Sequence, residues 1–252
     1  MEFKSSNPFL KGKNFENTSR SNDDVLAVHL ETMTVSGTIN KGFTMLLMLL
    51  STALISWWLV GNGYNPMVFT IGGGVIGLIL VLVASFKPTT SPFTAPAYAL
   101  FEGLFIGGLS AVFESMYPGL VIKAVSATFI TFLVCFGLYK YNIVKVTETF
   151  KSVVIGATMA IFAFYLISWI ASMFIDFQPI HQGNSLMSIG ISVFVIIVAA
   201  LNLFLDFDMI EKGSQSRAPK YMEWFAAMGI MITLVWLYVE FLRLFAKLSS
   251  KD

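Results

Sequence analysis

Two carboxylates lie where a long apolar run ends, in residues 201–213 (LNLFLDFDMIEKG). These residues are Asp206 and Asp208, and the apolar segments elsewhere in the chain contain almost no charge. An acid at the end of a membrane span is costly unless it is solvated or paired, so the two acids are candidates for a functional site. The alternative is that they only mark the point where a helix leaves the membrane.

Three further charged residues could act with them. Glu102 lies inside an apolar run and is followed by glycines, Glu240 lies inside another apolar run, and Lys87 closes a third. Carboxylates that share a poorly solvated site couple their titrations, and their oxygens are the ligands that Ca²⁺ prefers. Protonation would discharge such a site and weaken an ion pair to Lys87. These residues could therefore provide a Ca²⁺ or proton site with Asp206 as metal ligand, and an electrostatic latch at Lys87. The alternative is a static buried ion pair without a function.

The composition identifies the class of protein that must position these residues. Hydrophobic residues make up 56% of the 252 residues and charged residues 12%, whereas soluble domains carry roughly 25% charged residues. The chain is therefore expected to be a membrane protein whose partners are the lipid bilayer and the cations Ca²⁺ and H⁺. A net charge of +1 provides no basic field for nucleic acid, and the single cysteine, Cys135, excludes an intrachain disulfide.

The distribution of apolar runs predicts an all-α fold with seven transmembrane helices. Residues 1–40 are polar and are interpreted as a flexible cytoplasmic arm, and residues 41–248 as the transmembrane domain. Each run is long enough for a membrane-spanning helix, and none alternates as the strands of a β-barrel do. The expected spans are residues 43–60, 66–86, 95–112, 120–139, 153–174, 187–207 and 222–245. Glycines in the second span, at positions 72, 73, 74 and 77, predict a surface that another helix approaches closely.

The positive-inside rule gives the orientation. The loops that share a side with the N-terminus hold nearly all the loop lysines and arginines, which predicts a cytoplasmic N-terminus. The basic residues after the last span count against this orientation. The residues that support it are Lys87, Lys140, Lys145, Lys151, Lys212, Arg217 and Lys220, and those that oppose it are Arg243, Lys247 and Lys251.

Orientation converts sequence position into depth. One cluster is expected near the inner end of the bundle, formed by Asp206, Asp208, Glu102, Glu223 and Lys87. Glu240 lies 19 positions beyond Tyr221, or roughly 28 Å along a straight helix, which places it near the outer end. There it could pair with Lys123 or, three positions along its own helix, with Arg243.

Several segments resemble the Bax inhibitor-1 family. They are LNLFLDFDMIEKG, TLVWLYVEFLRLFAKL and APAYALFEGLFIGG, together with TMTVSGTINKG and RAPKYMEW, which are similar to a bacterial branch with an extended N-terminus. The resemblance covers roughly residues 33–250 and is specific in the combination of its motifs. It implies six helices around a central seventh, in a bacterial cytoplasmic membrane, with a pH-sensitive passive leak of Ca²⁺.

The resemblance also implies roles for particular residues. The family pairs acids on helices six and seven and has a basic latch on helix two. Asp206 matches the Asp-x-x-x-Ile motif of helix six, Glu240 matches the acid of helix seven, and Lys87 matches the latch only by location. Depth conflicts with this pairing, because it places Asp206 and Glu240 at opposite ends of the bundle. An alternative register places Met231 or Thr233 opposite Asp206. In that register the second carboxylate must come from Asp208, Glu102 or Glu223, or the pair is absent.

Two functions therefore follow as expectations. The first is the proton-gated Ca²⁺ leak, with Asp206 as sensor and no cofactor. The second is a non-conducting membrane regulator that acts through helix contacts on a protease or stress-response protein. The glycine surface of the second span and the polar arm 1–40 motivate it. An enzyme is not expected, because the sequence has no HExxH, no CxxC and no Ser–His pair within a span.

Overall fold

The computed structural model describes residues 32–174, 183 and 185–250. This part of the chain contains seven helices long and apolar enough to cross a membrane, which confirms the predicted fold class. Their bounds are α2 Val35–Gly61, α3 Pro66–Phe86, α4 Ser91–Met116, α5 Leu120–Lys140, α6 Glu148–Phe174, α7 Leu186–Gln215 and α8 Met222–Ser249, with a 3₁₀ turn, η2 Pro88–Thr90, before α4. Residues 1–31 of the predicted arm lie outside the described residues, and α2 already begins at Val35.

Local sequence signals explain where several helices begin. Thr34, Asn65 and Ser185 precede α2, α3 and α7, and each side chain accepts a hydrogen bond from a backbone N–H of the first turn. These residue types satisfy N–H groups that otherwise have no partner inside a helix. Pro66 occupies the first turn of α3, where its missing N–H costs nothing.

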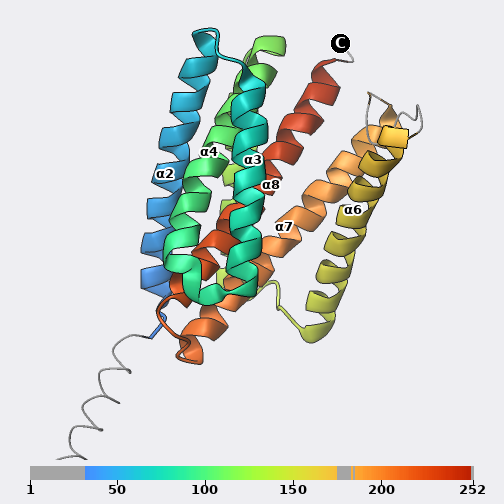
Figure 1. The fold of residues 1–252 in the computed structure, drawn as a ribbon. Helices are drawn as coiled ribbons and strands as arrows, with labels where there is room; N and C mark the ends of the chain where they lie inside the picture. The colour runs from blue at the N-terminus through green and yellow to red at the C-terminus, as the bar shows by residue number, and fades with distance from the viewer. Residues whose placement is uncertain (1–31, 175–182, 184, 251–252) are drawn as a thin grey trace, which may run out of the picture.

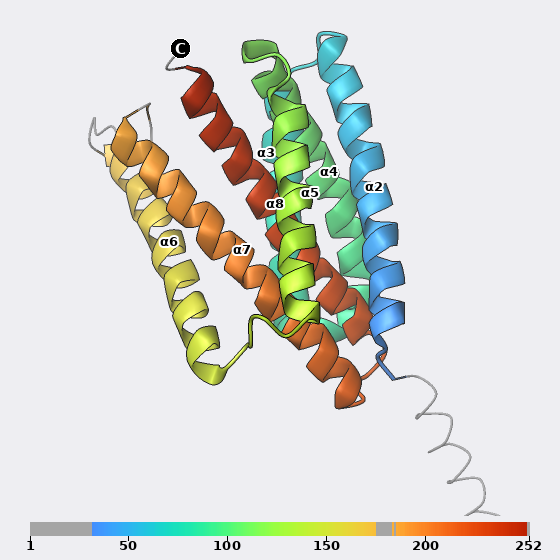
Figure 2. The same ribbon diagram turned by 180° about the vertical axis from the view of Figure 1, so that it is seen from behind.

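The last helix, α8, occupies the centre of the bundle. It packs against α2, α4, α5 and α7, and it contacts α6 through a hydrogen bond between Tyr165 and Glu240. Figure 1 shows α8 running behind α3 and α4, and the view from behind in Figure 2 shows α5 crossing its other side. Half of its most apolar 18-residue window is buried, against 17% of the equivalent windows in α2, α3 and α6.

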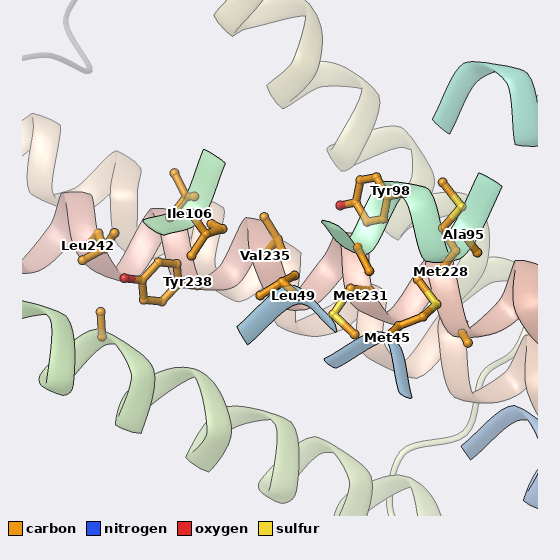
Figure 3. Close-up of a cluster of buried hydrophobic side chains, with 14 of the residues drawn as sticks. Met45, Leu49, Ala95, Tyr98, Ile106, Met228, Met231, Val235, Tyr238 and Leu242 are labelled. Atoms are coloured by element: carbon orange, nitrogen blue, oxygen red, sulfur yellow. The ribbon is translucent and has the colours of Figure 1, made fainter. Parts of the chain in front are cut away.

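The largest apolar cluster follows α8 through the bundle. Met228, Met231, Val235 and Leu242 of α8 are buried against residues of α2 and α4 such as Met45. Figure 3 shows these side chains on α8, with Leu49 from α2 and Ile106 from α4 beside them. The apolar side chains on the outside of the bundle are largely exposed, as expected for helices that face lipid.

Glycines bring α3 and α4 into close contact. A Cβ at Gly73 would lie 2.5 Å from the carbonyl oxygen of Phe101 and 2.7 Å from the amide nitrogen of Phe105. The close helix approach predicted for the second span is therefore present, and it lies inside the fold. Gly72, the neighbouring glycine, faces open space.

The bundle has two chemically different ends. At one end of the bundle α3, α5 and α7 end and α2, α4, α6 and α8 begin. We call it the basic end because of the basic residues it carries, which are Lys87, Lys140, Lys145, Lys151, Lys212, Arg217 and Lys220. The sixth span was predicted to end at position 207, but α7 continues to Gln215. The prediction ended the helix too early because hydropathy locates only the apolar part of a helix, and the last turns of α7 are polar. Asp206 is therefore inside a helix, nine residues before its end.

Candidate functional site

Asp206 of α7 contacts the central helix. Its Oδ2 accepts a hydrogen bond of 2.6 Å from the Thr233 hydroxyl of α8. Gly229, one turn earlier on α8, leaves room for the carboxylate, whose Oδ1 lies 3.4 Å from the position that a Cβ of Gly229 would take. We call this contact of Asp206 with Gly229 and Thr233 the α7–α8 seam. Among the described residues, no lysine or arginine forms an ion pair with Asp206.

Asp208, two residues further along α7, lies in a different environment. Its Oδ2 is 2.9 Å from Lys212 Nζ and 3.2 Å from Lys151 Nζ of α6. Lys151 also pairs with Glu148 at 3.0 Å. Asp208 and both lysines line a cavity of about 540 Å³ at the basic end. Asp208 therefore belongs to a surface ion network and not to the α7–α8 seam.

Glu223 joins the beginning of α8 to the beginning of α2. The side chain is 2% exposed and accepts hydrogen bonds from Thr34 N at 2.9 Å and Thr34 Oγ1 at 3.0 Å, and it pairs with Lys41 Nζ. A Cβ at Gly37 would collide with its carboxylate, so a larger residue there would have to displace Glu223 from its partners. Every oxygen of Glu223 thus has a donor, and the carboxylate serves to hold two helices together.

Glu240 does not meet Asp206. It lies seven residues beyond Thr233 on α8, about 10 Å further along the axis. Its Oε1 is 2.9 Å from Arg243 and accepts a 3.4 Å hydrogen bond from Tyr165 of α6. Its Oε2 is buried and has no hydrogen-bond partner in the part of the chain that the structure describes. The pairing with Arg243 is the one expected from their spacing, and Lys123 takes no part in it.

Glu102 lies near the middle of α4 and faces α3. Its Oε2 lies 2.7 Å from the position that a Cβ of Gly77 would take, with the Tyr98 ring against the same glycine. The residue is 8% exposed, and no described residue forms a hydrogen bond or ion pair with it. Lys87 is exposed at the end of α3, and within the described residues it forms no ion pair that could act as a latch.

The structure corrects the expected inner cluster. Its five members take part in separate contacts. Asp208 and Glu223 pair with lysines at the basic end, whereas Glu102 packs against α3. The register in which Thr233 lies opposite Asp206 is the one observed. Across residues 32–174, 183 and 185–250, no group of three His, Cys, Asp or Glu side chains converges as a metal site would require.

Sequence reasoning missed the basic partners of two acids. Lys41 pairs with Glu223 across 182 positions, and Lys151 pairs with Asp208 although it was assigned to a loop. Both lysines lie in the first turns of helices at the basic end, so the expected orientation already placed them near these acids. What remains inside the apolar bundle is a small set of sparsely bonded carboxylates, which can change protonation or attract a cation.

The comparisons with known proteins agree with this architecture. Residues 7–250 match the family described as Bax inhibitor 1 like. A search of curated proteins found no match. Because the match extends over nearly the whole chain and includes all seven helices, this chain belongs to the Bax inhibitor 1 like family.

Proposed function

We propose that this protein is a pH-sensitive cation leak in which Asp206 is the proton sensor and Ca²⁺ is a transported ion. The observation that supports it most directly is the contact of Asp206 with Thr233. An ionisable residue inside a transmembrane helix is costly, and such residues commonly mark ion pathways or proton relays. Family membership supports the same function, because the resemblance implies a Ca²⁺ leak.

The α7–α8 seam offers a simple way to couple protonation to the packing of two helices. Charged Asp206 accepts a strong hydrogen bond from the Thr233 hydroxyl, because bonds to ionised acceptors are roughly twice as strong as neutral ones. Protonation removes that charge and weakens the contact between α7 and the central helix. Glu240, about 10 Å further along α8, would be the second carboxylate that a cation meets. In this proposal the two acids act in sequence and do not form a pair.

The proposal includes an orientation and a location. The basic end faces the cytoplasm of a bacterial cell, in keeping with the positive-inside rule, so the N-terminus is cytoplasmic. Transport of this kind needs no catalytic chemistry and no bound cofactor. The partners it requires are the bilayer, Ca²⁺ and H⁺.

The packing of the glycines favours a leak over a regulator that acts through helix contacts. One motivation for the regulator was the glycine surface of the second span, but Gly73 and Gly77 are occupied by α4 within the same chain. Gly103 and Gly107 of α4 are likewise covered, by Leu49 and Ala53 of α2. These glycines therefore have an internal role that needs no protein partner. The other motivation, the arm 1–40, lies largely outside the described residues.

The test is Ca²⁺ flux into proteoliposomes at a series of pH values. We expect Asp206→Asn to abolish the dependence of flux on pH, because the amide cannot titrate. Glu211→Gln is a matched control, since Glu211 lies five residues further along α7 and bonds only to groups near the surface, Tyr139 and Gln215. An unchanged pH profile in Asp206→Asn would remove Asp206 as sensor, and absence of flux in the wild type would remove the leak itself.

A further inference from the structure

Glu102 is a buried carboxyl group in the membrane-spanning part of the bundle that the proposed leak does not use. It lies 11 residues after the start of α4 and 14 before its end, or about 16 and 21 Å from the two ends of the helix. This places it near mid-depth in the bundle, between α3 and α4. The α7–α8 seam lies on other helices, so the two carboxylates are separate features of the fold.

The surroundings of Glu102 supply no charge to balance it. The helix it faces, α3, contains no titratable residue from Pro66 to Phe86, and η2 contains none. On α4 itself the titratable neighbour is Tyr98, one turn earlier. The groups on the other helices that pack on α4 are engaged elsewhere or lie at the helix ends. Lys41 of α2 binds Glu223. On α8, Tyr238 bonds to Ser110, Glu240 pairs with Arg243, and Lys247 donates to Ser188 and Ser192. On α5, Tyr139 bonds to Glu211 and Cys135 to Ala200, while Lys123 and Lys140 lie near the two ends of the helix.

The shape of the site excludes a multidentate metal ion. Ca²⁺ takes six to eight oxygen ligands, and the described residues around Glu102 offer one carboxylate and one phenol. The carboxylate lies where a side chain at Gly77 of α3 would otherwise be. A single carboxyl group without further oxygen ligands around it can still bind a proton.

We propose that Glu102 is a proton-binding site within the bilayer, separate from the α7–α8 seam, and that it reacts with apolar carbodiimides that enter from the lipid. The reaction adds the reagent without a leaving group or a change of oxidation state. The carboxylic proton moves to one carbodiimide nitrogen and a carboxyl oxygen bonds to the central carbon. The resulting O-acylisourea rearranges to a stable N-acylurea by transfer of the acyl group to nitrogen.

The experiment treats the full chain in lipid nanodiscs with dicyclohexylcarbodiimide and locates the adduct by intact mass and peptide mapping. We expect an adduct on the peptide that contains Glu102, formed roughly tenfold or more faster than any on Glu240, whose charge is held by Arg243. The rate should fall as pH rises, because the reagent needs the acid form. A water-soluble carbodiimide should instead label exposed Glu148 and leave Glu102 unmodified.

Variants sharpen the assignment. Glu102→Gln should lose the adduct, and Glu211→Gln should keep it. If Glu102→Gln does not fold, the wild-type peptide map decides the question by itself. An unlabelled Glu102, a rate that does not depend on pH, or equal labelling by the water-soluble reagent would each overturn the proposal. Flux is not a readout here, so failure of the proposed leak would leave this result unaffected.

Discussion

Carboxylates at the basic end of the bundle and those within its membrane-spanning part have opposite surroundings. At the basic end, Glu223 receives three donors and Asp208 pairs with two lysines. Within the bundle, Asp206 receives one hydroxyl and Glu102 receives no donor from the described residues. Carboxylates thus hold helices together at the basic end, where hydrogen-bond donors and lysines surround them. Inside the bundle, where such donors are few, Asp206 and Glu102 remain available to bind protons or cations.

This difference in bonding is informative because lysine or arginine side chains could in principle pair with carboxylates in both regions. Most lysines among the described residues lie at the basic end, so few basic side chains are available to the carboxylates inside the bundle. An unpaired carboxyl group costs stability in an apolar environment, and proteins retain such groups mostly where function requires them. We therefore expect substitutions of carboxylates at the basic end to lower stability. Substitutions of those inside the bundle should instead change the dependence of Ca²⁺ flux on pH.

Glu223→Ala should produce the largest loss of stability. It removes the acceptor of Thr34 and leaves Lys41, which is 18% exposed, without its partner. Breaking a buried ion pair by removing one member costs about 3 kcal/mol or more. The measurement is unfolding in detergent, by heat or by titration with a denaturing detergent. A loss below about 1 kcal/mol, typical of exposed pairs, would erase the contrast between the two regions.

Glycine substitutions should give an intermediate and graded effect. Gly73→Ala places a methyl group against the backbone of α4 and should cost about 1–3 kcal/mol, the usual penalty for overpacking. Gly77→Ala meets only the movable carboxylate of Glu102, so its cost should be smaller. Gly72→Ala is the matched control, since its Cβ would face open space. Equal stabilities of the three variants would contradict the α3–α4 contact described above.

Thr233→Val should have the smallest effect on stability and a clear effect on function. Loss of one hydrogen bond costs about 1 kcal/mol, and valine keeps the shape of threonine. Because the hydroxyl contacts the proposed sensor, the pH profile of Ca²⁺ flux should change. Thr233→Ser retains the donor and should keep the wild-type profile. If valine and serine variants behave alike, the α7–α8 seam has no part in sensing.

Sequence reasoning predicted features that depend on local pattern. The seven spans follow from apolar runs, and the Glu240–Arg243 pair follows from helical spacing. Sequence reasoning could not decide which residue of α8 lies opposite Asp206. The motifs identify the family, but they do not show where α7 ends, and α7 continues to Gln215. Sequence reasoning also missed the pairing of Lys41 with Glu223, since contacts between distant segments depend on how all seven helices pack.

The junction of α2 with α8 also constrains how the molecule can be assembled. Thr34 and its acceptor Glu223 are 189 positions apart, Met33 N donates to Ala218 O at 2.7 Å, and Thr32 forms an isolated bridge with Pro219. The central helix follows the other six described helices in the chain, so these are synthesised before the element on which they pack. Formation of contacts so distant in sequence is slow. During biosynthesis Lys41 is therefore without its counter-charge, and α2 cannot reach its final position, until the beginning of α8 has been synthesised.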